Sequence, residues 1–138
     1  METITKSAQE TKDLGRKIGA SLRGGEILAL TGDLGSGKTT FVQGLAEGLG
    51  IEKNIISPTF ILMKKYETGE KDLYHVDLYR LEGDATGELK NLGAMDFWGK
   101  ENSIFVVEWA EKAQSAFPQN TRWIEFEYMS ENERIIKT

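Results

Sequence analysis

The sequence predicts an α/β fold in which helices cover both faces of a mixed β-sheet, giving three layers. Two observations carry this prediction. Short apolar runs with the composition of buried strands alternate along the chain with segments whose apolar residues recur at helical spacing. Two pairs of strand-like segments are separated by turn residues and predict β-hairpins, which add antiparallel pairing. The length of 138 residues suits a single domain spanning residues 1–138.

The first helix is predicted by a capping box at its start. The Ser7 hydroxyl can accept a hydrogen bond from the backbone three residues on, where Glu10 supplies the returning carboxylate. The helical face that follows is formed by Ala8, Thr11, Leu14, Ile18 and Leu22. The helix is therefore expected to run to about Leu22, where Gly24-Gly25 end it.

The next segment carries the most informative motif of the chain. Residues 26–30 are largely apolar and predict a buried strand, whereas residues 40–49 have helical spacing. Between them, residues 32–39 have the sequence Gly-Asp-Leu-Gly-Ser-Gly-Lys-Thr, which fits the phosphate-binding loop pattern Gly-x4-Gly-Lys-Ser/Thr. Strand, glycine-rich loop and helix in this order predict a three-layer P-loop NTPase fold.

Each part of this loop has a chemical role in binding a nucleotide. Glycines allow the backbone to curl so that successive N–H groups face phosphate oxygens, and the following helix adds its positive N-terminal end. Lys38 is predicted to bind the β- and γ-phosphates, and the Thr39 hydroxyl to complete the coordination of Mg²⁺. The residues expected to contact the nucleotide here are Asp33, Leu34, Gly35, Ser36, Gly37, Lys38, Thr39 and Thr40.

The rest of the chain predicts further strands and short helices. Strands are expected where β-branched and aromatic residues are enriched, at residues 60–66, 72–78, 103–107, 121–128 and 134–137. Helical segments are expected at residues 85–92, 93–98 and 110–116. Residues 103–107 are apolar almost throughout, which is typical of a central strand.

A carboxylate follows this central strand at Glu108. Phosphate-loop enzymes use such a residue to hold Mg²⁺ beside the loop hydroxyl, directly or through water. Because the carboxyl ends of parallel strands meet at one edge of a sheet, we expect Glu108 near Lys38 and Thr39, where it can reach the metal or polarise the attacking water. The alternative is a glutamate that merely ends a strand in solvent.

Two further segments have both a functional and a plain interpretation. Residues 75–80 alternate polar and apolar side chains, so a strand here places His75, Asp77 and Tyr79 on one face. That face forms part of the site, or it is the solvated face of a half-exposed edge strand. Residues 57–60, Ser-Pro-Thr-Phe, suit a loop whose threonine approaches a γ-phosphate, but on sequence alone they are more typical of a plain turn.

The composition restricts the function classes. The chain has 17 Lys and Arg residues against 22 Asp and Glu residues, a formal net charge of -5, and its basic residues are scattered. A protein that grips nucleic acid by itself needs a basic surface, so direct RNA or DNA binding is disfavoured. The absence of cysteine excludes disulfides and thiolate metal sites. We expect a cytoplasmic protein without a signal peptide or a membrane span.

Four segments, taken in order, are similar to one family. They are the phosphate loop at residues 32–40, Ser-Pro-Thr-Phe at 57–60, His-x-Asp-Leu-Tyr-Arg at 75–80 and Val-Glu-Trp at 107–109. Together they resemble the bacterial TsaE (YjeE) ATPases, which take part in making threonylcarbamoyladenosine in tRNA. The resemblance extends from the region of Glu10 to Arg134. A phosphate loop alone would not single out this family, whereas the other three segments do.

The resemblance implies an activity, cofactors and partners. It implies that the protein binds ATP with Mg²⁺ and hydrolyses ATP slowly. It also implies action with TsaD, which transfers the threonylcarbamoyl group, and with TsaB, which supports TsaD, so that tRNA is met only through the complex. The sequence offers no obvious arginine finger close to the site. A partner can supply one or otherwise order the site, so docking of partners is expected to stimulate hydrolysis.

The resemblance also implies roles for particular residues. Lys38, Asp77 and Glu108 are expected to be catalytic, with Asp77 near the γ-phosphate. Thr39 and Glu108 are expected at the metal. The residues expected to border the nucleotide beyond the loop are Thr11, Trp109 and Arg134.

Other function classes stay open at this point. A small-molecule kinase needs an acceptor pocket and usually a mobile lid that carries arginines, and we find no insertion of that length in the sequence. A GTPase is disfavoured, since the chain has no Asn-Lys-x-Asp segment to select guanine. A binding module that uses the nucleotide only as a switch has the same residues as an ATPase and differs from it in rate.

Overall fold

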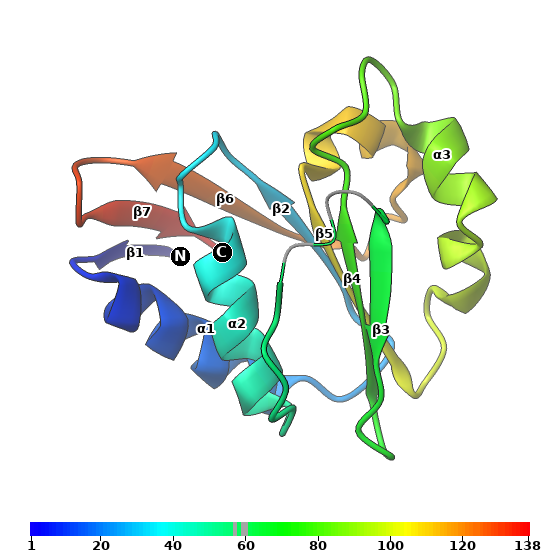
Figure 1. Ribbon diagram of the computed structural model, residues 1–138, viewed down its shortest axis with the longest axis horizontal. Coiled ribbons are helices and arrows are strands. Elements are labelled where there is room, and N and C mark those ends of the chain that lie inside the picture. The colour runs from blue at the N-terminus through cyan, green and yellow to red at the C-terminus, as the bar shows by residue number, and fades with distance from the viewer. Residues whose placement is uncertain (57, 59–60) are drawn as a thin grey trace.

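The computed structural model describes residues 1–56, 58 and 61–138. Within these residues, seven strands form one sheet (Figure 1), namely β1 (Glu2–Thr5), β2 (Ile27–Thr31), β3 (Met63–Tyr66), β4 (Asp72–Asp77), β5 (Ser103–Glu108), β6 (Arg122–Tyr128) and β7 (Arg134–Lys137). Their order across the sheet is β1-β7-β6-β2-β5-β4-β3. The four central strands pair in parallel and the outer ones antiparallel, so the predicted mixed sheet and both predicted hairpins are confirmed.

Helical segments cover both faces of this sheet, as the three-layer prediction requires (Figure 1). They are α1 (Ala8–Ser21), α2 (Lys38–Gly48), α3 (Thr86–Asn91) and two 3-10 helices, η1 (Ala94–Phe97) and η2 (Ala110–Ala116). Alternate residues of β5 show the two layers of core. Ile104 and Val106 pack with α1 and α2, whereas Phe105 and Val107 pack with the other three segments. No helix in the described part of the chain is long and apolar enough to cross a membrane.

The parallel strands bring their carboxyl ends to one edge of the sheet. Strands β6, β2, β5 and β4 run side by side in the same direction. The phosphate loop follows β2 at this edge, Glu108 ends β5 and Asp77 ends β4. In open sheets of this kind the crevice at the carboxyl edge is the usual ligand site.

The structure differs from the predicted elements where pairing, rather than local sequence, decides. Strand β1 was not predicted, because Ile4 is its one apolar residue and a single residue gives no alternating pattern. The strand is formed by antiparallel pairing with β7, which places Ile4 opposite Ile135. The alternative interpretation of residues 75–80 as part of a half-exposed edge strand is wrong: β3 covers that side, and β4 is buried from Leu73 to Asp77. The predicted helix at residues 110–116 is a 3-10 segment interrupted at Ala113.

The predicted strand at residues 60–66 is shorter than expected. It begins at Met63, because Leu62 has a positive φ of 69° that a strand cannot contain. The Leu62 N–H donates to the Pro58 carbonyl at 2.6 Å, and its own carbonyl accepts the Asp77 N–H at 2.9 Å. Three of the four residues in the segment 57–60 lie outside the described residues, so the prediction made for it stays untested.

Helices α1 and α2 approach so closely that glycines are needed between them. A Cβ atom at Gly44 would lie 1.9 Å from the backbone oxygen of Lys12, and one at Gly19 would lie 2.2 Å from that of Leu45. These are backbone atoms, which cannot move aside as the end of a side chain can. The glycines therefore hold α1 directly against the helix that begins at the phosphate loop.

Gly44→Ala is expected to destabilise the protein by about 2 kcal/mol or more, because overpacking a close contact costs roughly 1–3 kcal/mol and a backbone carbonyl cannot yield. Gly87→Ala in α3 is the matched control. Nothing lies within 4 Å of its added Cβ, so it should be neutral or gain up to about 1 kcal/mol from helix propensity. Denaturant unfolding measures both, and equal midpoints for Gly44→Ala and the wild type would contradict the close approach.

Candidate nucleotide-binding site

The phosphate loop turns through three glycines whose backbone angles other residues rarely adopt. The φ angle is 141° at Gly32, 78° at Gly35 and 100° at Gly37. A Cβ atom at Gly32 would also lie 2.5 Å from the backbone oxygen of Phe126, because the loop runs against β6. Gly37 caps α2, and its carbonyl accepts the Phe41 N–H at 2.9 Å. The N-terminus of α2 therefore follows the loop directly.

The Lys38 amine lies inside this loop. It donates to the backbone oxygens of Gly32 and Asp33, the second at 3.1 Å, and lies 4.1 Å from the centre of the Trp109 ring. Lys38 is only 5% exposed. Burial lowers the pKa of its amine, against the opposing effect of acidic neighbours, of which Glu108 is the strongest. A cation in such a partly desolvated hollow attracts an anion more strongly than it does in water.

Glu108 lies beside the loop, as expected, and does not face solvent. It is 2% exposed, and its Oε1 accepts a hydrogen bond from the Thr39 hydroxyl at 3.0 Å. Its Oε2 lies 2.5 Å from Nε2 of His75. The register of β4 against β5 places Asp77 opposite Glu108. Two buried carboxylates therefore meet the loop at the ends of neighbouring strands, and the solvent-facing alternative for Glu108 is wrong.

A cavity of about 440 Å³ opens between the loop and these strand ends. Most of the residues that the sequence proposed for the site lie together on its wall. The lining residues are Leu34, Gly35, Ser36, Gly37, Lys38, Thr39, Thr40, Asp77, Tyr79, Glu108, Trp109 and Arg134. The volume, the loop backbone and the Lys38 amine suit a small ligand with several phosphate groups.

Two of the proposed residues lie outside this cavity. Thr11 is buried, its hydroxyl lies 2.7 Å from the Thr5 hydroxyl, and it borders a small neighbouring hollow of about 80 Å³ next to Arg134. Asp33 offers its backbone oxygen to Lys38, but it borders a separate hollow of about 510 Å³. That hollow is acidic, being lined also by Glu111, Glu125 and Glu127.

Tyr79 is a wall residue whose position the sequence did not predict. The prediction placed it on a strand face with Asp77, but β4 ends at Asp77 and Tyr79 lies in the turn that follows. Its N–H donates to the Asp77 carboxylate at 2.9 Å, and its ring centre lies 5.2 Å from that of Trp109. The usable signal was the aspartate two residues before it, since Asp side chains commonly bind the backbone in this way at turns.

Arg134 lies against the phosphate loop and lines the cavity. Its Nε donates to the Gly35 carbonyl at 3.2 Å, and its Nη1 donates to the carbonyls of Ser130 at 2.6 Å and Glu133 at 2.9 Å. Its guanidinium carbon lies 4.6 Å from the centre of the Tyr128 ring. Arg134 thus ties the turn between β6 and β7 to the loop.

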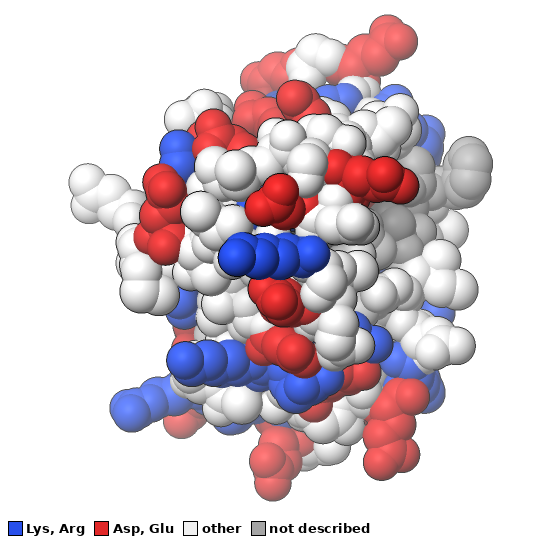
Figure 2. Space-filling model, turned by 90° about the vertical axis from the view of Figure 1, so that its left-hand side faces the viewer, with Lys and Arg blue, Asp and Glu red and all other residues white. Residues whose placement is uncertain are grey.

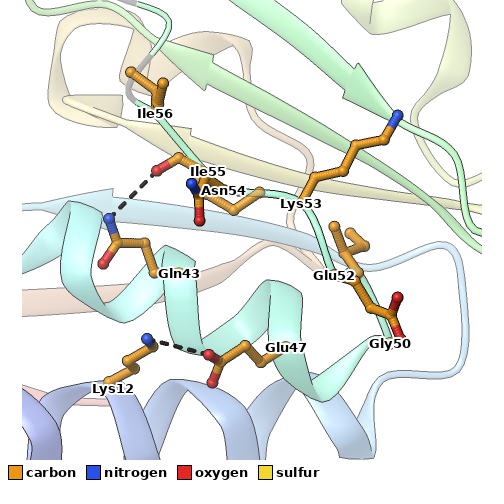
Figure 3. A pocket seen from close by; sticks show the side chains of 10 residues that line it. Lys12, Gln43, Glu47, Gly50, Glu52, Lys53, Asn54, Ile55 and Ile56 are labelled. Carbon is orange, nitrogen blue, oxygen red and sulfur yellow. Dashed lines mark hydrogen bonds and ion pairs between the residues drawn. The ribbon is translucent and has the colours of Figure 1, made fainter.

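A larger cavity of about 760 Å³ lies beside α1 and α2, away from the loop (Figure 3). An ion pair of 3.1 Å joins Lys12 to Glu47 there, and the Gln43 amide donates to the Ile55 carbonyl at 3.3 Å. These polar groups satisfy one another, whereas the smaller cavity gathers a loop lysine, two carboxylates and a helix N-terminus. Chemistry rather than size therefore identifies the candidate site.

The charges of one side of the molecule are mixed. Figure 2 shows the side that carries β1 and β7, where Lys and Arg side chains lie among Asp and Glu side chains. Opposite charges that are interspersed in this way produce only a weak field at a distance. On this side, the basic side chains gathered in the lower part of the view have acidic side chains directly above and below them (Figure 2).

The fold and the site together define the class of protein. A mixed sheet carries a glycine-rich loop at its carboxyl edge, the helix after the loop starts at its lysine, and a buried carboxylate contacts the loop threonine. This is the arrangement of a P-loop nucleotide-binding protein.

Comparison with known proteins gives the family. A sequence profile described as "Threonylcarbamoyl adenosine biosynthesis protein TsaE" matches residues 5–136. The "tRNA threonylcarbamoyladenosine biosynthesis protein TsaE" of Bacillus subtilis strain 168 is 39% identical over 132 residues, which cover 96% of this chain and 80% of that protein. The protein of the same description from Treponema pallidum strain Nichols is 38% identical over 137 residues, covering 99% and 98%.

A solved structure agrees with the sequence comparison. The crystal structure of Bacillus subtilis YdiB matches with a TM-score of 0.81 at 34% identity, covering 99% of this chain and 82% of that chain. The protein belongs to the TsaE family, and the resemblance drawn from its four sequence segments is confirmed.

Proposed function

We propose that this protein is a Mg²⁺-dependent ATPase of tRNA threonylcarbamoyladenosine biosynthesis, slow alone and stimulated by partner proteins. The observation that carries the proposal is the contact between the Thr39 hydroxyl and Glu108 on the wall of the cavity that also holds Lys38. Membership of the TsaE family supports the pathway. TsaD and TsaB are the proposed partners, through which a single cytoplasmic domain of residues 1–138 would meet tRNA.

The residues present suit Mg²⁺. This ion prefers oxygen ligands, and proteins usually hold it with one or two groups together with phosphate oxygens and water. Thr39 and Glu108 supply two such oxygens 3.0 Å apart. Among the described residues, no group of three or more His, Cys, Asp or Glu could hold a metal by itself. When bound, the ion would neutralise charge on the phosphates, and Thr39 and Glu108 are its proposed protein partners.

The geometry of the site supports a proposed role for each of these parts. The loop backbone and Lys38 bind the phosphates, since both present positive charge to one hollow. Glu108 orients or deprotonates the attacking water, and Asp77, at the end of the neighbouring strand, acts near the γ-phosphate. Hydrolysis breaks the bond between the γ-phosphorus and its bridging oxygen, and the water oxygen takes that place on phosphorus. The residues proposed to border the rest of the nucleotide are Thr11, Trp109 and Arg134.

Product analysis tests this proposal. ATP is incubated with the isolated protein, with and without Mg²⁺, and then with TsaB and TsaD added. We expect slow, Mg²⁺-dependent release of ADP and free phosphate that increases with the partners. Transfer of the phosphate to a small molecule would instead indicate a kinase. An absence of turnover under all conditions would leave a nucleotide-dependent switch.

Docking onto the TsaB–TsaD pair is expected to depend on the nucleotide. The loop, Asp77 and Glu108 line the same cavity, so a γ-phosphate there can change the surface at this edge of the sheet. If ATP strengthens docking, then docking must strengthen ATP binding by the same factor. Retention by immobilised TsaB–TsaD is measured with ATP, with ADP and without nucleotide. Equal retention in all three, with no stimulation of hydrolysis, would contradict the prediction.

A further inference from the structure

His75 contacts Glu108 of the candidate site but does not line the cavity. It is the one histidine of the sequence, and its side chain is fully buried on β4. Its Nε2 lies 2.5 Å from Oε2 of Glu108, whereas its Nδ1 is buried and makes no hydrogen bond within the described residues. Buried polar atoms are nearly always paired, so an imidazole kept with one nitrogen unpaired indicates that the other contact matters.

The surroundings of the two ring nitrogens decide where the proton lies. A proton on Nδ1 would be a buried donor without an acceptor, which is the costlier kind of unpaired group. A proton on Nε2 has the Glu108 carboxylate as its acceptor, and the unfilled position at Nδ1 is then only a lone pair. This arrangement favours Nε2 of His75 as the donor to Glu108.

Two different donors consequently hold the two oxygens of Glu108. Oε2 accepts from His75, and Oε1 accepts from the Thr39 hydroxyl at 3.0 Å. His75 is opposite Val106 in the parallel pairing of β4 with β5, so it approaches Glu108 from a neighbouring strand in the interior of the sheet. Thr39 approaches from the first turn of α2. A glutamate side chain that is anchored at both oxygens has lost the freedom to turn its carboxylate.

We propose that His75 is a positioning residue, which fixes the Glu108 carboxylate so that Oε1 faces the Thr39 hydroxyl. The inference rests on the proposed function, because that function is what requires this orientation of Glu108. Partners that orient a metal-linked carboxylate typically change metal affinity or activity by about 10- to 100-fold when they are removed. Both the hydrolysis rate and the contribution of Mg²⁺ to nucleotide affinity should therefore depend on His75.

Variants at this position separate positioning from simple packing. In His75→Leu we expect the single-turnover rate of the full chain to fall by about 10- to 100-fold, with ATP affinity in the absence of Mg²⁺ unchanged and the gain from adding Mg²⁺ reduced. His75→Gln offers an amide N–H near the former Nε2 and should recover part of the rate. Leu73→Val, a buried change on the same strand, is the packing control and should hydrolyse like the wild type. A wild-type rate and Mg²⁺ response in His75→Leu would overturn the proposal.

Nitrogen NMR of protein labelled at histidine gives a readout that needs no turnover, and one histidine yields one pair of ring signals. We expect Nε2 to carry the proton in the wild type, and both signals to shift in Glu108→Gln but not in the exposed Glu111→Gln. A proton on Nδ1, or signals indifferent to Glu108→Gln, would overturn the proposal. A wild type that does not hydrolyse ATP counts against the proposed function alone, because these signals and the Mg²⁺ response still decide the role of His75.

Discussion

Replacement of Lys38 by alanine is expected to remove most ATP binding and turnover while leaving the free protein folded. Hydrogen bonds to a charged group contribute about 1.5–3 kcal/mol, so affinity should fall roughly 10- to 100-fold. Turnover should fall further, because losing one group that stabilises developing charge costs about 100- to 1000-fold in rate. The amine is the charged group that the loop itself encloses, where it donates to the backbone of Gly32 and Asp33.

The Lys38→Ala variant should keep the stability of the free protein because the buried amine is itself unfavourable for folding. Burial lowers the pKa of the Lys38 amine, so the folded state holds its proton less firmly than the unfolded chain does. This cost to folding is fully present below the folded pKa, and it fades as pH rises through that pKa toward the ordinary value. At neutral pH, removing the amine therefore relieves an unfavourable term, as is common at functional sites.

Calorimetric ATP titration and thermal unfolding without nucleotide measure the two halves of this prediction. Lys17→Ala, an exposed change on α1, controls for the loss of a lysine charge. We expect Lys38→Ala to unfold at a temperature no lower than the wild type and to lose affinity, and Lys17→Ala to do neither. A folded Lys38→Ala with wild-type affinity and turnover would contradict the assignment.

Glu108→Gln is expected to reduce turnover far more than binding. The amide keeps the size of the side chain, so the packing against Thr39 and His75 is preserved, but the negative charge and the basic oxygen are lost. A positioned general base contributes about 100- to 10,000-fold in rate, which sets the expected loss in the chemical step. ATP affinity rests mainly on the loop backbone and Lys38 and should change little.

Single-turnover hydrolysis with saturating protein isolates the chemical step of Glu108→Gln from binding. Glu111→Gln removes a nearby exposed carboxylate and is the matched control, with a rate expected to equal that of the wild type. Normal hydrolysis by Glu108→Gln would show that another group handles the water. Asp77 would then be the first candidate, because this residue lines the same cavity.

The sequence predicted those parts of the site whose geometry is local. The phosphate loop is defined by consecutive residues, and its glycines have the positive φ angles that only glycine accepts readily. Glu108 was predictable beside Thr39 because parallel strands share an edge, so its place follows from the strand that precedes it. Both inferences use only the order of strands and helices along the chain. Neither requires knowing which strands are neighbours in the sheet.

What the sequence could not predict depends on neighbours across the sheet. The contact of His75 with Glu108 exists because β4 lies next to β5, and alternation alone suited an edge strand equally well. Strand β1 has no pattern of its own and is formed by pairing with β7. Tyr79 left its predicted strand face because the Asp77 carboxylate binds the backbone of the turn. In each case a distant or competing partner overrides local preference.

The position of β2 in the sheet has a consequence for how the protein folds during its synthesis. Ile27 of β2 pairs with Phe105, and Leu28 pairs with Arg122, so both neighbours of this strand are made long after it. During synthesis both edges of β2 remain unpaired, which exposes an apolar strand to wrong pairing. Its contacts with β5 and β6 are distant in sequence, and contacts of this kind form slowly. The strand that precedes the phosphate loop is held on both sides only after β5 and β6 have been synthesised and have paired with it. A nucleotide that recognises the finished loop can therefore select only chains whose sheet is already assembled.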